Sequence, residues 1–243
     1  MGTLRQDILA DFQDAVRDGY QSFLEEFGFS SYKDDLIHWY LLRNDVLFSL
    51  QMYTVFSSPA SMYLAFAAKP LFIKTEIPAP LVTTDYYNND YFILHDKWQH
   101  FYRRRPIHYP RGEHFGGVPT KERIGYYLEI IQTPEDAFEQ RKELWRKADY
   151  TYLREDFVDE VIYYQDAEFW EQAIQTKETY FRNAPDVDET KNPYAMRHRA
   201  QLRALEDPAV RLEYIAELEK KKDAQLAALR KKVPAAIQPK PSF

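Results

Sequence analysis

The chain contains no cysteine among its 243 residues. This absence excludes disulfide frameworks, thiolate zinc sites, iron–sulfur clusters and cysteine nucleophiles. Histidine is a poor substitute as a metal ligand here, because His95, His100, His108 and His114 are five, eight and six residues apart. Those spacings match neither a helical i, i+4 pair nor a compact metal-binding loop. We therefore expect the protein to hold no metal and to need no redox cofactor.

Long hydrophobic runs are also missing. The longest nearly apolar run, Pro59 to Ala68, is far shorter than the roughly 20 residues that span a bilayer. The opening segment, MGTLRQDILADF, interrupts its apolar pattern with acids, unlike a secretory signal. We therefore expect a cytoplasmic protein with no membrane partner. The phosphate-binding motifs G-x-G-x-x-G and G-x-x-x-x-G-K-[ST] and the nucleophile motif G-x-S-x-G are absent too, so no catalytic residue can be assigned.

Acidic residues outnumber basic ones by 38 to 32, which gives a net charge of −6 at pH 7. A negative chain is an unfavourable general binder of nucleic acid or anionic membrane, because their phosphates repel it. Hydrophobic residues make up 45% of the chain and aromatic residues 16%. A disordered protein would lack that supply, so the composition indicates a folded protein with a sizeable core.

Residues 3–28 carry the clearest periodic pattern. Apolar residues recur there at steps of three and four, Thr3 can cap the start, and Gly28 ends the pattern, which predicts one amphipathic helix. The expected apolar stripe consists of Leu4, Ile8, Phe12, Val16, Tyr20, Phe23 and Phe27. Its aromatic character suggests that the helix lies on a sheet.

Strand-like runs follow this helix. The runs 36–43 and 46–56 flank Asn44-Asp45, a polar pair suited to a tight turn, and a third strand is expected over 61–68. Both alternating faces of the second run carry apolar residues, so we expect both to be at least partly covered. The economical interpretation is an α+β fold, in which the N-terminal amphipathic helix packs on an antiparallel β-meander and a helical C-terminal region follows.

The later part of the chain divides by composition. Six prolines between Lys69 and Pro119 disfavour long regular elements. The segment Thr133-Pro134-Glu135-Asp136 combines a cap, a proline at the first helical position and acids in the first turn. We expect an α+β domain over 1–132 with a long loop at about 69–119, a helical extension of that domain over 133–182, a linker-like segment over 183–206, a last helix over 207–232 and a disordered tail over 233–243.

The segment 97–115, KWQHFYRRRPIHYPRGEHF, is basic and aromatic within an acidic chain. Arginines can grip a phosphate or carboxylate, aromatic rings can stack on bases, and histidines can ligate metal or move protons. The alternative is a surface loop whose rings pack inward while its charges stay hydrated. Within the functional interpretation, the histidine spacing favours an anion or an acidic partner over a metal. The candidate binding residues are Trp98, His100, Tyr102, Arg103, Arg104, Arg105, His108, Tyr109, Arg111 and His114.

Two further patterns have simpler explanations. Glu155, Asp156, Asp159 and Glu160 form an acidic cluster that could hold a hard cation together with His198, but a solvated helix face is favoured. The last helix carries a seam that could pack on the protein, pair with a second copy or enter a partner's groove. That seam consists of Leu212, Ile215, Leu218, Lys222, Leu226, Leu229 and Val233.

The order of the first elements resembles a known group of proteins. A capped amphipathic helix ends at Phe27-Gly28-Phe29, a strand with His38-Trp39-Tyr40 follows, and after a turn comes a hydrophobic strand with Ser49-Leu50-Gln51. This order, over roughly residues 3–95, is similar to small bacterial proteins of a domain-of-unknown-function family, some suspected of toxin-immunity roles. The resemblance implies a bacterial, cytoplasmic α+β protein and assigns no catalytic residue.

These observations favour binding over catalysis. Tyr, Trp and Arg dominate the energetics of protein interfaces, so the favoured function is a non-catalytic protein-binding module, immunity- or inhibitor-like, whose partner has an acidic surface. The alternative is an enzyme or binder that acts on a phosphorylated or nucleic-acid ligand through the loop at 95–115. A small phosphorylated ligand and a homo-oligomer formed through the C-terminal helix are compatible with either hypothesis, whereas nucleic acid is the less favoured partner.

Overall fold

The computed structural model describes residues 2–55, 61–79, 82–83, 92–101, 105–109, 121–148 and 152–237. The chain forms two compact units. Unit 1 comprises residues 1–71, 75–147 and 226–243, and unit 2 comprises residues 72–74 and 148–225. The units differ from the domains expected from the sequence, because each is assembled from separate stretches of chain. None of the described helices is long and apolar enough to cross a membrane.

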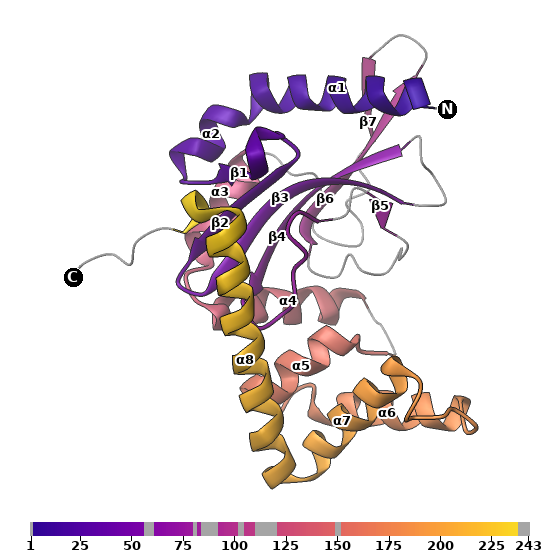
Figure 1. The fold of residues 1–243 in the computed structure, drawn as a ribbon. Coiled ribbons are helices and arrows are strands. Elements are labelled where there is room, and N and C mark those ends of the chain that lie inside the picture. The colour runs from indigo at the N-terminus through magenta and orange to yellow at the C-terminus, as the bar shows by residue number, and fades with distance from the viewer. Residues whose placement is uncertain are drawn as a thin grey trace, which may run out of the picture. The chain divides into compact units, whose positions relative to one another are not determined.

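Unit 1 combines helices with one sheet (Figure 1). Its helices are α1 (Gly2–Gly19), α2 (Gln21–Glu26), η1 (Tyr32–Asp34), α3 (Lys121–Ile130), α4 (Pro134–Ala148) and η2 (Pro234–Ala236). Its strands are β1 (Ser30–Ser31), β2 (His38–Arg43), β3 (Val46–Val55), β4 (Ser61–Pro70), β5 (Val82–Thr83), β6 (Phe92–Phe101) and β7 (Arg105–Tyr109). The described elements therefore confirm the α+β class, with a helix before the sheet and helices after it.

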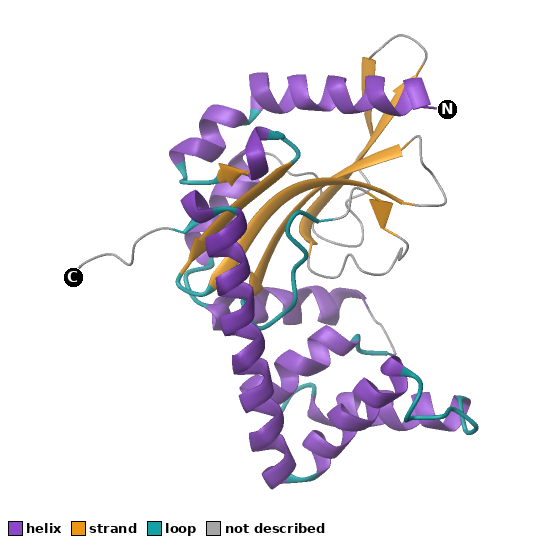
Figure 2. Ribbon diagram, viewed as in Figure 1, coloured by secondary structure: helices purple, strands orange, loops and turns teal. Residues whose placement is uncertain are grey.

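The sheet has the strand order β1-β2-β3-β4-β6-β7, and all neighbours in this order are antiparallel (Figure 2). The short β5 pairs with β3 in parallel. The predicted turn between β2 and β3 is confirmed, because Arg43 pairs with Val46 and only two residues intervene. Asn44 and Asp45 have φ angles of 49° and 65°, the left-handed pair that a two-residue hairpin turn requires.

The two faces of the sheet are buried by different parts of the chain. On β3, Phe48 and Leu50 belong to a core with Phe12 and Val16 of α1 and with residues of α3. Leu47, on the opposite face, joins a second core with residues of 71–77 and with the C-terminal end of the chain. The expectation that both faces of this strand are covered is therefore confirmed. Figure 1 shows α1 along one side of the sheet.

Two corrections concern unit 1 before residue 120. The predicted single helix over 3–28 is two helices, α1 and α2, which are separated at Tyr20. The predicted loop at 69–119 is wrong for 92–101 and 105–109, which are strands β6 and β7. Proline is compatible with β7 because this strand ends the strand order, and an edge strand does not need every N–H for pairing.

Unit 2 is helical. Its elements are α5 (Glu155–Tyr164), α6 (Trp170–Asn183), α7 (Pro193–Glu206) and the larger part of α8 (Pro208–Lys232), whose residues from Leu226 onward belong to unit 1. The predicted linker over 183–206 is wrong for α7. This helix has a complete start signal, because Asn192 Oδ1 accepts hydrogen bonds from the backbone N–H groups of Tyr194 and Ala195, with Pro193 at the first helical position.

The C-terminal segment also differs from the expectation. Residues 233–237 are not a disordered tail: Val233 and Ala236 are buried, and Ile237 forms a β-bridge with Leu42. Residues 238–243 of that prediction lie outside the described residues. The seam of α8 packs on the protein itself, within unit 2 at Leu218 and within unit 1 from Leu226 onward.

Truncation tests the role of this C-terminal segment. Ending the chain after Val233 removes the fully buried Ala236 and the bridge of Ile237. We expect the free energy of unfolding of unit 1 to fall by about 1–3 kcal/mol, the usual effect of removing a few buried apolar groups. Urea denaturation followed by circular dichroism measures this change. The control ends after Ile237 and keeps all of these contacts, so an equal loss in both truncations would contradict the assignment.

Candidate functional site

The basic and aromatic segment is partly a β-hairpin. The register of β6 and β7 pairs Trp98 with His108 and His100 with Pro106, so positions 98, 100 and 108 fall on one face of the ladder. Arg105 pairs with Phe101, and Tyr109 pairs with Lys97, on the other face. The predicted binding residues are thus divided between two faces of the edge hairpin. Positions Tyr102, Arg103, Arg104, Arg111 and His114 lie outside the described residues.

A second polar arrangement precedes β2. His38 Nδ1 lies 2.7 Å from Asp35 Oδ2, while Asp35 Oδ1 accepts hydrogen bonds from the backbone N–H groups of Ile37 and His38 at 2.9 and 3.0 Å. Burial would raise the pKa of Asp35, but the hydrogen bonds from the His38 side chain and from these backbone groups outweigh it, so the pKa lies below its usual value. An ionised carboxylate at Nδ1 keeps the proton on that ring nitrogen.

The loop that holds this Asp35–His38 pair has an uncommon backbone. Lys33, Asp34 and Leu36 have φ angles of 49°, 56° and 58°, a conformation that costs side-chain-bearing residues of order 1 kcal/mol or more each. Hydrogen bonds offset this strain: Ser31 Oγ accepts from the Leu36 N–H at 3.0 Å, and Trp39 Nε1 donates to the Leu36 carbonyl at 3.2 Å. The loop therefore has one defined geometry that fixes the direction of the carboxylate.

The His38 side chain of this pair is buried on one face of the sheet. His38 pairs with Gln51 across the β2–β3 ladder, and Ser49 lies diagonally from it on the same face. His38 Nε2, Ser49 Oγ and Gln51 Oε1 are buried without a hydrogen-bond partner among the described residues. Because these atoms are enclosed by protein, we interpret the Asp35–His38 pair as a structural contact that orients β2, not as a site open to substrate.

The largest polar cluster lies inside unit 2. Lys177 of α6 is fully buried (0% exposed), and its Nζ lies 3.2 Å from His198 Nδ1 of α7. His198 Nε2 lies 3.1 Å from Glu155 Oε1 of α5, and the ring of Tyr180 stacks on the imidazole at a centroid distance of 3.8 Å. A protonated Lys177 can only donate, so Nδ1 accepts and the imidazole proton is on Nε2, facing the carboxylate.

Asp159 is the second centre of this cluster. Its carboxylate accepts hydrogen bonds from Arg197 Nη2 at 2.7 Å, Gln201 Nε2 at 2.7 Å and the Tyr214 hydroxyl at 2.6 Å. Arg197 also donates to Asp156 Oδ1 at 2.5 Å. We call the set Glu155, Asp156, Asp159, Lys177, Arg197, His198, Gln201 and Tyr214 the ionic network. It joins α5, α6, α7 and α8 within unit 2.

The network shifts the titration of its members. The hydrogen bond from His198 lowers the pKa of Glu155 to about 2. Burial lowers the pKa of Lys177 to about 8, although the carboxylates of Glu155 and Asp159 act in the opposite direction. Burial, together with the neighbouring Asp159, raises the pKa of the Tyr214 hydroxyl. Each charge is thus held by its partners, and the arrangement suits a structural polar core better than a catalytic centre.

The ionic network corrects the interpretation of the acidic cluster on α5. A solvated helix face was expected, yet Asp159 and Glu160 are buried. The hydrogen-bond partners of Asp159 come from α7 and α8, far along the chain, and Lys177 of α6 interacts with it electrostatically. Sequence reasoning missed Lys177 and Arg197. The sequence held one indication of this network. Gln201 follows His198 by three residues and Arg197 by four, so on a helix the three side chains lie on the same face.

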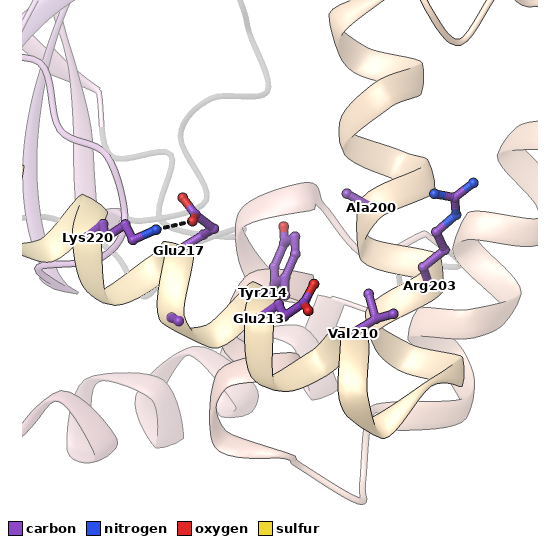
Figure 3. Close-up of a pocket in the computed structure, with 8 residues that line it drawn as sticks. Ala200, Arg203, Val210, Glu213, Tyr214, Glu217 and Lys220 are labelled. Carbon is purple, nitrogen blue, oxygen red and sulfur yellow. Dashed lines mark hydrogen bonds and ion pairs between the residues drawn. The ribbon is translucent and has the colours of Figure 1, made fainter.

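A groove with a volume of about 480 Å³ lies between α7 and α8 of unit 2 (Figure 3). Its lining residues are Ala200, Arg203, Val210, Glu213, Tyr214, Ala216, Glu217 and Lys220. Lys220 pairs with Glu217 at the exposed rim. The hydroxyl of Tyr214, which lines the groove, donates to Asp159 of the ionic network. Charges of both signs on an open surface suit contact with another macromolecule more than enclosure of a small substrate.

Comparison with known proteins finds no match among protein-family models, curated proteins or solved structures. The fold and the sites therefore define the protein only as a class: an α+β unit with a basic edge hairpin, joined to a helical unit with an ionic network. Among the described residues, no group of three or more His, Asp or Glu side chains could hold a metal ion.

Replacing Asp35 tests the Asp35–His38 pair. Asp35→Asn loses the charged acceptor for the imidazole, and we expect the free energy of unfolding to fall by about 1–3 kcal/mol at neutral pH. The pKa of Asp35 is lowered in the folded protein, so its contribution is present above the pKa of the unfolded chain and disappears as the pH falls through the folded value. The gap between wild type and variant should therefore close in acid. Asp34→Asn, at an exposed neighbour with the same backbone conformation, is the control.

Lys177 should contribute a pH dependence of the same sense as Asp35, but in an alkaline window. Its pKa falls from 10.5 to about 8 on folding, so the folded state binds fewer protons between these values and stability rises with pH across that window. A difference of this size corresponds to roughly 3 kcal/mol at most. We expect the unfolding free energy of wild type to rise relative to Lys177→Met between pH 8 and 10.5. Lys191→Met, at an exposed lysine, should show no such change, and parallel pH profiles for all three proteins would contradict the assignment.

Proposed function

We propose that this chain is a non-catalytic protein-binding module, immunity- or inhibitor-like, that contacts an acidic partner through the segment 97–115. The observation that carries the proposal is the position of the described part of this segment: residues 97–101 belong to β6 and residues 105–109 form β7, which is the last strand in the order of the sheet. An edge strand offers backbone groups for recognition, and this one belongs to a basic and aromatic stretch of an acidic chain.

The arrangement of the titratable groups supports binding over catalysis. The most perturbed lysine, Lys177, is fully buried and paired with His198. The oriented His38 is also enclosed. Neither group has the combination of a perturbed pKa and an accessible cleft that an active site needs. A bacterial origin and a cytoplasmic location belong to the same proposal, through the resemblance of residues 3–95 to small bacterial proteins of a domain-of-unknown-function family, some suspected of toxin-immunity roles.

The distribution of charge along the chain favours a partner with an acidic surface. Three consecutive arginines, Arg103 to Arg105, give a local positive charge to a chain whose net charge is −6. The net negative charge of the chain repels a strongly acidic partner at long range, and the positive charge of this segment offsets that repulsion locally. Arginine also pairs with carboxylates in a bidentate geometry that lysine does not offer.

Replacing Arg103 to Arg105 by alanine tests the proposal. The probe is a fluorescent poly-glutamate peptide, and anisotropy is measured over a range of salt concentrations. We expect the affinity to fall by roughly tenfold, since an ion pair at a protein surface contributes a few tenths to about 1 kcal/mol. The remaining binding should depend less on salt. The thermal midpoint should be nearly unchanged, because exposed charges contribute little to stability.

The control carries the same loss of charge elsewhere in unit 1. Lys121, Arg146 and Lys147 are exposed on α3 and α4, and replacing them by alanine should leave peptide binding nearly intact. Equal losses in both variants would show general charge attraction and contradict the proposal. If the Arg103–Arg105 variant unfolds, the arginines are structural and the surface is misplaced. Preferential binding of inorganic pyrophosphate or of single-stranded RNA would favour the alternative, a site for phosphorylated or nucleic-acid ligands at 95–115.

A further inference from the structure

The groove between α7 and α8 has walls of opposite charge. Arg203 lies on the α7 wall, and Glu213 lies on the α8 wall, in the second turn of that helix (Figure 3). Both side chains are exposed, and neither forms an ion pair with another described residue. The other two charged lining residues, Glu217 and Lys220, neutralise each other. The four charged lining residues have no net charge, and Arg203 also interacts electrostatically with Glu189 of the same unit.

Two exposed apolar side chains, which are not among the lining residues, each lie one helical turn from a residue that lines the groove. Leu212 is 69% exposed and lies one helical turn before Ala216 on α8, and Met196 is 53% exposed and lies one turn before Ala200 on α7. The sequence pattern placed Leu212 in the buried seam of the last helix, and the structure contradicts this. Large exposed apolar side chains beside a groove are typical of a surface that another protein covers.

We propose that a second copy of this chain docks on the α7–α8 groove through a two-fold interface. In a two-fold interface the same patch meets itself, so each residue type must find its complement within the patch. The groove satisfies this condition, because Arg203 of one protomer can pair with the partner subunit's Glu213, and symmetry supplies the reciprocal pair. Leu212 and Met196, each one helical turn from a lining residue, provide the apolar area that ion pairs at an exposed rim do not supply.

The charges argue for a second copy rather than an unrelated partner. A strongly acidic partner would meet Glu213, and a strongly basic one would meet Arg203, so like charges would face each other in both cases. Only a partner with both signs at matching positions avoids this repulsion, and the chain itself is such a partner. The surface is distinct from the segment 97–115, so self-association and binding of an acidic peptide can be measured independently.

Charge reversal tests the interface in the full chain. Sedimentation velocity over a wide protein concentration range should reveal a monomer–dimer equilibrium for the wild type. Arg203→Glu alone and Glu213→Arg alone should each weaken the dimer by tenfold or more, because like charges then meet across the two-fold axis. The double variant R203E/E213R restores opposite charges and should recover most of the affinity. Leu212→Ser should weaken the dimer without changing its salt dependence.

Matched reversals at exposed residues of α6, Glu178→Arg and Arg182→Glu, should leave the dimer intact. A wild type that stays monomeric at every concentration would overturn the proposal. A dimer that ignores both single reversals, or a double variant that fails to recover, would also overturn it. Loss of the dimer in the Arg103–Arg105 variant but not in the groove variants would place self-association on the edge hairpin instead, again contradicting the groove.

Discussion

The central strand β3 needs cover on both of its faces, and this constraint organises unit 1. Phe48 and Leu50 on one face, and Leu47 on the other, are all buried. Helices α1 and α3 bury the first face, and residues 71–77 with the C-terminal end of the chain bury the second. An antiparallel sheet with one apolar face could be completed by local helices alone. Because this sheet has two apolar faces, the C-terminal end of the chain is needed to cover the second face and becomes part of the core.

The return of the chain explains why the compact units are discontinuous. Helix α8 begins in unit 2, and its last turns belong to unit 1, where Leu229 and Val233 reach the second core. Its seam is therefore used by the protein itself and is not available for a coiled coil. Leu212, at the start of the seam, is the exception because it is exposed, and the groove lies between α7 and the same part of α8.

Unit 2 relies on a different physical principle. Removing a lysine, an arginine and several carboxylates from water is expensive unless each charge is paired and hydrogen-bonded. The ionic network meets this condition, since Asp159 alone accepts hydrogen bonds from Arg197, Gln201 and Tyr214. Such a network adds less stability than apolar packing would. Its contacts join α5, α6, α7 and α8, and they favour one relative arrangement of these four helices, although Arg197 Nε and Gln201 Oε1 are buried without a hydrogen-bond partner among the described residues.

Local chemistry determined most of the elements directly from the sequence. The Asn44-Asp45 turn, the strands around it, the Thr133 start of α4 and the Pro208 start of α8 depend on neighbouring residues only. Tertiary structure decided the rest. The proline-rich stretch forms β6 because β4 supplies a partner strand, and the acids of α5 are buried because Lys177 and Arg197 meet them from distant helices. Pairing between residues far apart in the chain leaves no periodic signal in either segment, so only the folded chain reveals it.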